Sequence, residues 1–95
     1  VFHFIEALRD AALALGFSEE QARLLATETV VGAAALAADS TEDVTVLRQR
    51  VTSKGGTTEA ALNSLNADDF KAAILRAVRA AEARGRELGE LLGKD

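Results

Sequence analysis

Apolar side chains recur every three to four positions through each long segment of this chain, which is the spacing of one face of an α-helix. In the first segment, from Val1 to about Leu15, they lie at Phe2, Ile5, Leu8, Ala12 and Leu15. No segment of useful length alternates apolar and polar residues as a half-buried strand does. The pattern therefore predicts an all-α fold.

Turn and cap signals divide the chain into four or five helices. Gly16 suits the left-handed position that follows a helix, and Ser18 with Gln21 forms a capping-box pattern. The second helix is expected to run from Ser18 to about Ala38. Because charge is sparse after Glu28, we expect this helix to be buried on most sides.

Further polar breaks predict the remaining helices, at residues 44–51, at residues 59–65 and from Asp68 or Asp69 to about Leu92. The break at 39–43 can end the second helix and cap the next one. In the last helix, Gly85, Gly89 and Gly93 indicate either close contact with another helix or a fraying end, since each helical glycine costs about 1 kcal/mol relative to alanine.

The composition indicates a thin core. The chain has 95 residues, 48% of them apolar, and these are mostly Ala, Leu and Val with only four Phe. A domain of this length buries about two thirds of its unfolded surface. Small side chains let helices approach closely, but each adds little buried area. We therefore expect a helical bundle that completes its core with a partner, and the sequence shows no internal domain boundary.

Several classes of function are disfavoured. Without cysteine there is no disulfide or thiolate metal site, and the single histidine, His3, cannot build a zinc site alone. No Asp, Glu or Cys partner can be assigned beside His3, so a catalytic role for it is not favoured. The net charge of −4 argues against a nucleic-acid partner. No apolar run approaches the roughly 20 residues needed to span a membrane, and no G-x-G-x-x-G fingerprint is present.

The stretch Thr-Ser-Lys-Gly-Gly-Thr-Thr at 52–58 is the one candidate ligand site. Consecutive glycines expose backbone N–H groups, and the helix that follows adds unsatisfied donors and partial positive charge. Together these favour an anion such as a small carboxylate. The alternative is a turn followed by a threonine N-cap. Glu59 favours the cap, because its carboxylate complements the helix dipole and would repel an anion.

This loop resembles the Ser-Pro-Gly-Gly-Thr-Thr signature of the pyrroline-5-carboxylate reductases, and the resemblance covers nearly the whole chain. The opening Phe4-Ile5-Glu6-Ala7-Leu8 is similar to the start of that family's C-terminal domain, and 31–34 and 70–88 are similar to its small-residue helix and its last helix. Lys54 stands where most members carry proline, which we expect to loosen the loop without abolishing the site.

The resemblance implies that residues 1–95 are the C-terminal helical dimerisation and substrate-binding domain of a Rossmann-type reductase. The N-terminal dinucleotide-binding domain is absent from this chain, which lacks Met and opens on an apolar segment, so we expect a piece of a longer protein. The family reduces 1-pyrroline-5-carboxylate to L-proline by hydride transfer from NADPH or NADH bound in that missing domain. This chain alone is therefore expected to be inactive. An intertwined homodimer, up to a decamer in some members, and a cytoplasmic location are also implied.

Carried over to this sequence, the substrate-binding residues are Ser53, Gly55, Gly56, Thr57 and Thr58. The N–H groups of Gly56 and Thr57 and the hydroxyl of Ser53 would hold the substrate carboxylate. Thr58 is the catalytic candidate, since its hydroxyl would meet the ring nitrogen, orient the imine and assist its protonation. Two alternatives stay open: a purely structural dimerisation module without a ligand, and the helical domain of a related imine or hydroxyacid dehydrogenase.

Overall fold

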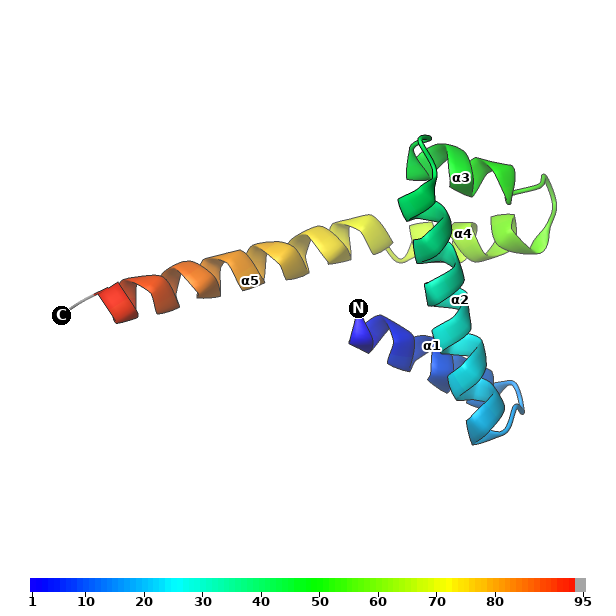
Figure 1. Ribbon diagram of the computed structural model, residues 1–95, viewed down its shortest axis with the longest axis horizontal. Coiled ribbons are helices and arrows are strands. Elements are labelled where there is room, and N and C mark those ends of the chain that lie inside the picture. Colours follow the sequence, from blue (N-terminus) through cyan, green and yellow to red (C-terminus); the bar gives the residue numbers. More distant parts are fainter. Residues whose placement is uncertain (94–95) are drawn as a thin grey trace. The chain divides into compact units, whose positions relative to one another are not determined.

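The computed structural model describes residues 1–93, so Lys94 and Asp95 of the expected domain lie outside it. The described residues form five helices and no strand (Figure 1): α1 (Phe2–Ala14), α2 (Glu19–Asp39), α3 (Val44–Arg50), α4 (Thr57–Ala67) and α5 (Phe70–Gly93). The all-α prediction is confirmed. The helices fall into two compact units, one from Val1 to Gln49 and one from Arg50 onward. The division reflects contacts that concentrate between α1 and α2 and between α4 and α5. The amino-acid composition does not change at this point, so nothing in the sequence indicates it.

Helices α1 and α2 form a hairpin whose turn and caps follow the sequence signals. Gly16 adopts a left-handed φ of +99°, and the N–H of Phe17 donates to the carbonyl of Ala12 at 3.2 Å. The Ser18 Oγ accepts from the Gln21 N–H at 3.2 Å, while the Ser18 N–H donates to the Gln21 Oε1 at 3.1 Å. The predicted capping box is therefore confirmed, and it fixes where α2 begins.

The core of the first unit is made of alanine. Among residues 1–93 only Ala12, Ala22 and Ala26 are buried. The expectation that α2 is buried on most sides is wrong for the chain by itself, since Val31 is 55% exposed and Leu36 is 67% exposed. In this unit the extensive contact of α2 is with α1, while α3 adds Val44 and Leu47 beside the end of α2. Many apolar residues of α2 are therefore left at the surface.

The polar break at 39–43 performs both expected tasks. Helix α2 ends at Asp39, its C-cap Ser40 has an extended backbone, and α3 begins beyond Asp43. The Thr45 N–H donates to the Asp43 Oδ2 at 3.0 Å. This hydrogen bond favours the charged carboxylate and lowers the pKa of Asp43 below its ordinary value of 3.8.

Helix α5 is an amphipathic helix of 24 residues in which no side chain is buried. The short connection from α4 to α5 includes Asp69. Its φ of +53° is left-handed, a conformation that Asp tolerates better than most residues. The charged face of α5 is solvated, with an Arg84–Glu87 pair at 2.8 Å and an Arg86–Glu82 pair. Its apolar face also lies at the surface, with large exposed side chains at Ile74, Leu75, Val78, Leu88, Leu91 and Leu92.

The glycines of α5 do not end the helix, which continues to Gly93. A Cβ added at Gly85 or Gly89 would meet no atom within 4 Å in the described part of the chain. Within the described part of the second unit, therefore, no other helix lies against these two glycines. No helix among residues 1–93 has both the length and the apolar content to cross a membrane.

Candidate functional site

The loop between α3 and α4 is a tight turn built on two glycines. The Gly56 N–H donates to the Ser53 carbonyl at 3.0 Å. Gly55 has a φ of +75°, in the left-handed region where a residue with a Cβ is strained. A glycine at position 55 is therefore what allows the chain to turn back into α4.

Helix α4 begins two residues earlier than the sequence predicts. Thr57 and Thr58 are its first two residues, rather than part of the loop, and Gly56 is its N-cap. A Cβ on Gly56 would lie 2.5 Å from the Ser53 Oγ and 3.1 Å from the Ser53 carbonyl oxygen, so a larger residue there would require Ser53 to shift. The threonine N-cap reading is thus wrong, because the N-cap residue has no side chain at all.

The backbone donors of this segment divide into occupied and available groups. Gly55 donates its N–H to the Glu59 Oε1 at 3.1 Å, and Gly56 donates to Ser53. The N–H groups of Thr57 and Thr58 lie in the first turn of α4, where no intrahelical acceptor exists. No side chain in the described part of the chain caps them. The first intrahelical bond of α4 runs from the Ala60 N–H to the Gly56 carbonyl, so the Glu59 N–H is in the same position. The Thr57, Thr58 and Glu59 N–H groups, at the partially positive end of a helix, are therefore the donors open to an anion.

The expected site residues all lie in the turn before α4 and in its first turn, but some of them have other roles than the sequence predicts. Thr57 is exposed and Thr58 is half-buried. Gly55 and Gly56 shape the turn, and the expectation that the Gly56 N–H serves as a free donor does not fit its bond to Ser53. Glu59 does more than complement the helix dipole, because its carboxylate also accepts a hydrogen bond from the Gly55 N–H in the loop. The sequence feature that could have indicated this contact is the position of Glu59 three residues after the N-cap, where a capping box carries Glu or Gln.

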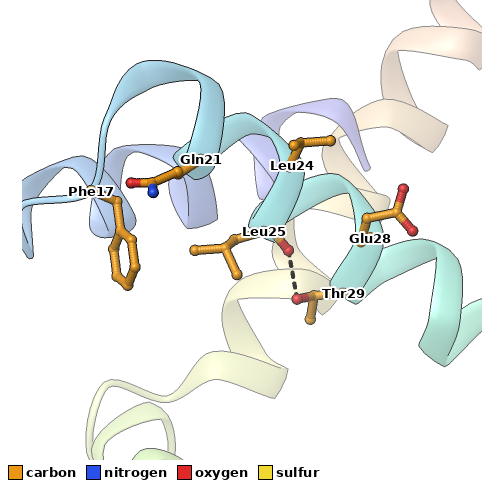
Figure 2. Close-up of a pocket in the computed structure, with 6 residues that line it drawn as sticks. All are labelled: Phe17, Gln21, Leu24, Leu25, Glu28 and Thr29. Atoms are coloured by element: carbon orange, nitrogen blue, oxygen red, sulfur yellow. Dashed lines mark hydrogen bonds between the residues drawn. The ribbon is translucent and has the colours of Figure 1, made fainter.

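The first unit has two further features outside this loop, an apolar groove and a histidine–glutamate pair. An open apolar groove runs along α2, with Phe17, Leu24 and Leu25 on it, and the Thr29 hydroxyl donates to the Leu25 carbonyl at 2.6 Å (Figure 2). Its lining is mostly apolar, with Gln21 and Glu28 at its side, so it offers surface for packing rather than groups for chemistry.

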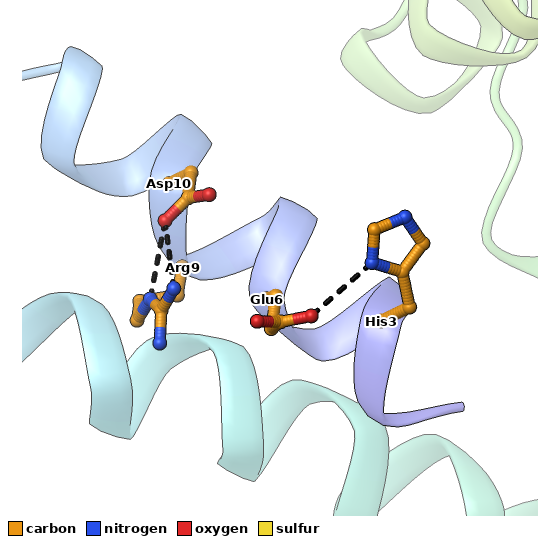
Figure 3. Close-up of polar contacts among 4 residues, drawn as sticks. All are labelled: His3, Glu6, Arg9 and Asp10. Carbon is orange, nitrogen blue, oxygen red and sulfur yellow. Dashed lines mark hydrogen bonds and ion pairs between the residues drawn. The ribbon is translucent and has the colours of Figure 1, made fainter.

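His3 has a partner that the sequence reading did not assign. Its Nδ1 lies 3.1 Å from the Glu6 Oε1, one helical turn on, beside a separate Arg9–Asp10 pair at 3.1 Å (Figure 3). The His3 side chain is 99% exposed, so the pair is a solvated surface contact. Within residues 1–93 no three His, Asp or Glu side chains lie close enough together to hold a metal ion.

Comparison with known proteins identifies the relatives of this chain. A family model described as pyrroline-5-carboxylate reductase dimerisation matches residues 1–88. The chain is 44% identical over 93 residues to pyrroline-5-carboxylate reductase of Pseudomonas aeruginosa, which covers 98% of this chain and 34% of that protein. For the Arabidopsis thaliana enzyme the identity is 42% over 90 residues, covering 95% and 33%.

Solved structures agree. Plasmodium falciparum pyrroline carboxylate reductase with NADP bound matches with a TM-score of 0.88 at 33% identity, over 93% of this chain and 34% of that one. The Coxiella burnetii pyrroline-5-carboxylate reductase matches with a TM-score of 0.87 at 44% identity, over 92% and 32%. This chain thus spans about a third of the length of these proteins. Since the family model matches all but the last few residues, the chain belongs to the pyrroline-5-carboxylate reductase dimerisation family.

Proposed function

We propose that this chain is the substrate-binding and dimerisation part of a pyrroline-5-carboxylate reductase. The observation that carries the proposal is the start of α4, where an N-cap without a side chain leaves the Thr57 and Thr58 N–H groups uncapped. The relatives and structures named above are all reductases of pyrroline carboxylate. Their names favour this reading over the helical domain of another imine or hydroxyacid dehydrogenase.

The substrate carboxylate is proposed to bind at this helix start. Backbone N–H groups at a helix N-terminus form short, charge-assisted hydrogen bonds to anions. The Thr57 and Thr58 N–H groups, with the Ser53 hydroxyl, are the donors we assign to the carboxylate. This assignment replaces the Gly56 N–H, which is bonded within the turn. Gly55 and Gly56 belong to the site because they shape it.

Thr58 is the residue we assign to the reacting end of the substrate. A hydroxyl both donates and accepts, so it can meet the ring nitrogen of the imine in either protonation state. With the carboxylate held by the backbone beside it, this contact fixes the orientation of the ring. It also stabilises charge at the nitrogen and can assist its protonation.

The nicotinamide cofactor, NADPH or NADH, is proposed to bind outside these residues. The chain has no G-x-G-x-x-G fingerprint, and residues 1–93 contain no strand from which such a loop could start. When bound, the cofactor supplies the hydride. What this chain supplies is the binding and orientation of the imine, so we expect the chain alone to show no turnover.

A homodimer is the partner arrangement that α5 supports. Its exposed apolar face, including Val78 and Leu88, needs cover, and the matching family model is described as a dimerisation domain. Assembly of such dimers up to a decamer and a cytoplasmic location rest on the family resemblance.

Substitution of Thr58 in a full-length reductase carrying this domain tests the proposal. Thr58→Val keeps the shape and removes the hydroxyl, and we expect kcat to fall about a hundredfold, as for loss of one donor at a reacting atom. Thr58→Ser retains the hydroxyl and should keep most of the activity. If Thr58→Val turns over substrate like the wild type, the domain is a structural dimerisation module without a ligand role.

A further inference from the structure

Glu59 reaches from the first turn of α4 back to the loop that precedes the helix. Its Oε1 accepts the Gly55 N–H at 3.1 Å, and its side chain is half-buried. Gly55 is the residue of the turn with a left-handed φ, +75°. One carboxylate therefore ties down the least restrained backbone position of the candidate site.

Helices α2 and α4 each have a Gln or Glu at the third helical position that accepts a backbone N–H, but the two N-termini are capped differently. At α2, Gln21 accepts the N–H of the N-cap Ser18, and the Ser18 Oγ accepts the Gln21 N–H in return. At α4 the corresponding N-cap N–H, that of Gly56, is already bonded to the Ser53 carbonyl. Glu59 instead takes the N–H one residue earlier, and no side chain returns a bond to α4.

This arrangement keeps one half of a capping box in a shifted form, with the Glu59 carboxylate on the Gly55 N–H instead of the N-cap N–H, and omits the other half. The retained half restrains the turn, and the omitted half leaves the N–H groups of the first turn of α4 unoccupied. We propose that Glu59 is a positioning residue, which holds the turn at Gly55 so that the Thr57 and Thr58 N–H groups keep one fixed arrangement for the substrate carboxylate. The inference rests on the proposed function of this loop.

The charge of Glu59 distinguishes positioning from simple electrostatic attraction. A carboxylate in the same helical turn repels an incoming carboxylate. Glu59 therefore aids substrate binding only through its hydrogen bond to Gly55, by reducing the conformational freedom that binding would otherwise remove. An uncharged side chain that still accepts the Gly55 N–H should then serve as well as glutamate.

The test compares Glu59→Ala with Glu59→Gln in a full-length reductase carrying this domain. Asn63→Ala is the matched control, since Asn63 is exposed one helical turn further along α4. Glu59→Ala removes the acceptor, and we expect the KM for 1-pyrroline-5-carboxylate to rise roughly tenfold, as for one lost hydrogen bond to a charged group, with kcat largely kept. Glu59→Gln should restore KM to near the wild-type value.

Hydrogen exchange of the peptide covering residues 52–58 gives a second measurement on the same proteins. Faster exchange in Glu59→Ala, but not in Glu59→Gln or Asn63→Ala, supports positioning. An unchanged KM in Glu59→Ala overturns the proposal, and so does a Glu59→Gln variant as impaired as Glu59→Ala. If Thr58→Val is impaired while Glu59→Ala is not, the function of the loop stands and the role of Glu59 falls. If Thr58→Val is unimpaired, both fall.

Discussion

The Ser53 side chain occupies the space into which a side chain at Gly56 would grow. The Ser53 Oγ lies 2.5 Å from the position of a Cβ on Gly56, and the Ser53 carbonyl accepts the Gly56 N–H at 3.0 Å. Two residues of the proposed carboxylate site are therefore coupled sterically as well as by a hydrogen bond.

We predict that Gly56→Ala raises the KM for substrate in a full-length reductase, because the added methyl group displaces Ser53 or opens the turn. Overpacking of this kind costs roughly 1–3 kcal/mol, which corresponds to about a fivefold to hundredfold effect. In a Ser53→Ala background the nearest side-chain atom is gone, so the added cost of Gly56→Ala should shrink. Purely additive KM effects in the double variant would contradict the coupling.

Ser18→Ala is predicted to destabilise the α1–α2 hairpin. The Ser18 Oγ accepts the Gln21 N–H at 3.2 Å, and loss of an N-cap side chain costs about 1 kcal/mol. Thermal unfolding followed by circular dichroism measures the change. Thr27→Ala, at an exposed position within α2, is the control and should be neutral or slightly stabilising. Equal melting of Ser18→Ala and the wild type would mean that the capping box contributes nothing.

The cap of α3 is predicted to depend on pH. The folded pKa of Asp43 is lowered by the Thr45 N–H, so its stabilising contribution is present above the ordinary value of 3.8 and is lost as the pH falls through the lower folded value. The Thr45 amide resonance should therefore shift over that acidic range. In Asp43→Asn, which keeps a capping oxygen without a titrating proton, the shift should vanish. The same shift in the variant would assign it to another group.

Val78→Glu is predicted to convert the proposed dimer to a monomer. Val78 is 61% exposed on the apolar face of α5, and a charge buried there without a partner opposes association. Light scattering at several concentrations measures the mass. Arg79→Gln, on the solvated side of the same turn, should leave the mass unchanged. A wild-type protein that is already a well-folded monomer would remove the basis for this prediction and for the proposed dimer.

The sequence predicted the parts of this fold that local chemistry determines. Gly16, Ser18 with Gln21, and Asp43 each act within a few residues of chain, so their roles could be inferred from residue type and spacing. The same holds for the amphipathic pattern of α5. The start of α4 was missed because threonine and glycine are similarly common N-caps, and the contact between Gly56 and Ser53 that decides between them is not visible in the sequence.

The exposure of α2 could not be inferred from its composition. A helix poor in charge is typical of a buried helix, but burial depends on how many elements surround it, and α1 is the helix that contacts α2 extensively in this unit. The contact of Glu59 with Gly55 was missed for a related reason. It depends on the Gly56 N–H being occupied by Ser53, which residue spacing does not reveal.

The alanines between α1 and α2 reverse the usual direction of mutational sensitivity. Ala22 is 0% exposed and Ala26 is 3% exposed, so the two helices approach each other across side chains of a single methyl group. Alanine scanning is blind to such a contact, because alanine is already its end point. The informative changes are additions: a valine at either position must push the helices apart. The residues that look least demanding in this sequence are thus the ones that tolerate the least variation in size.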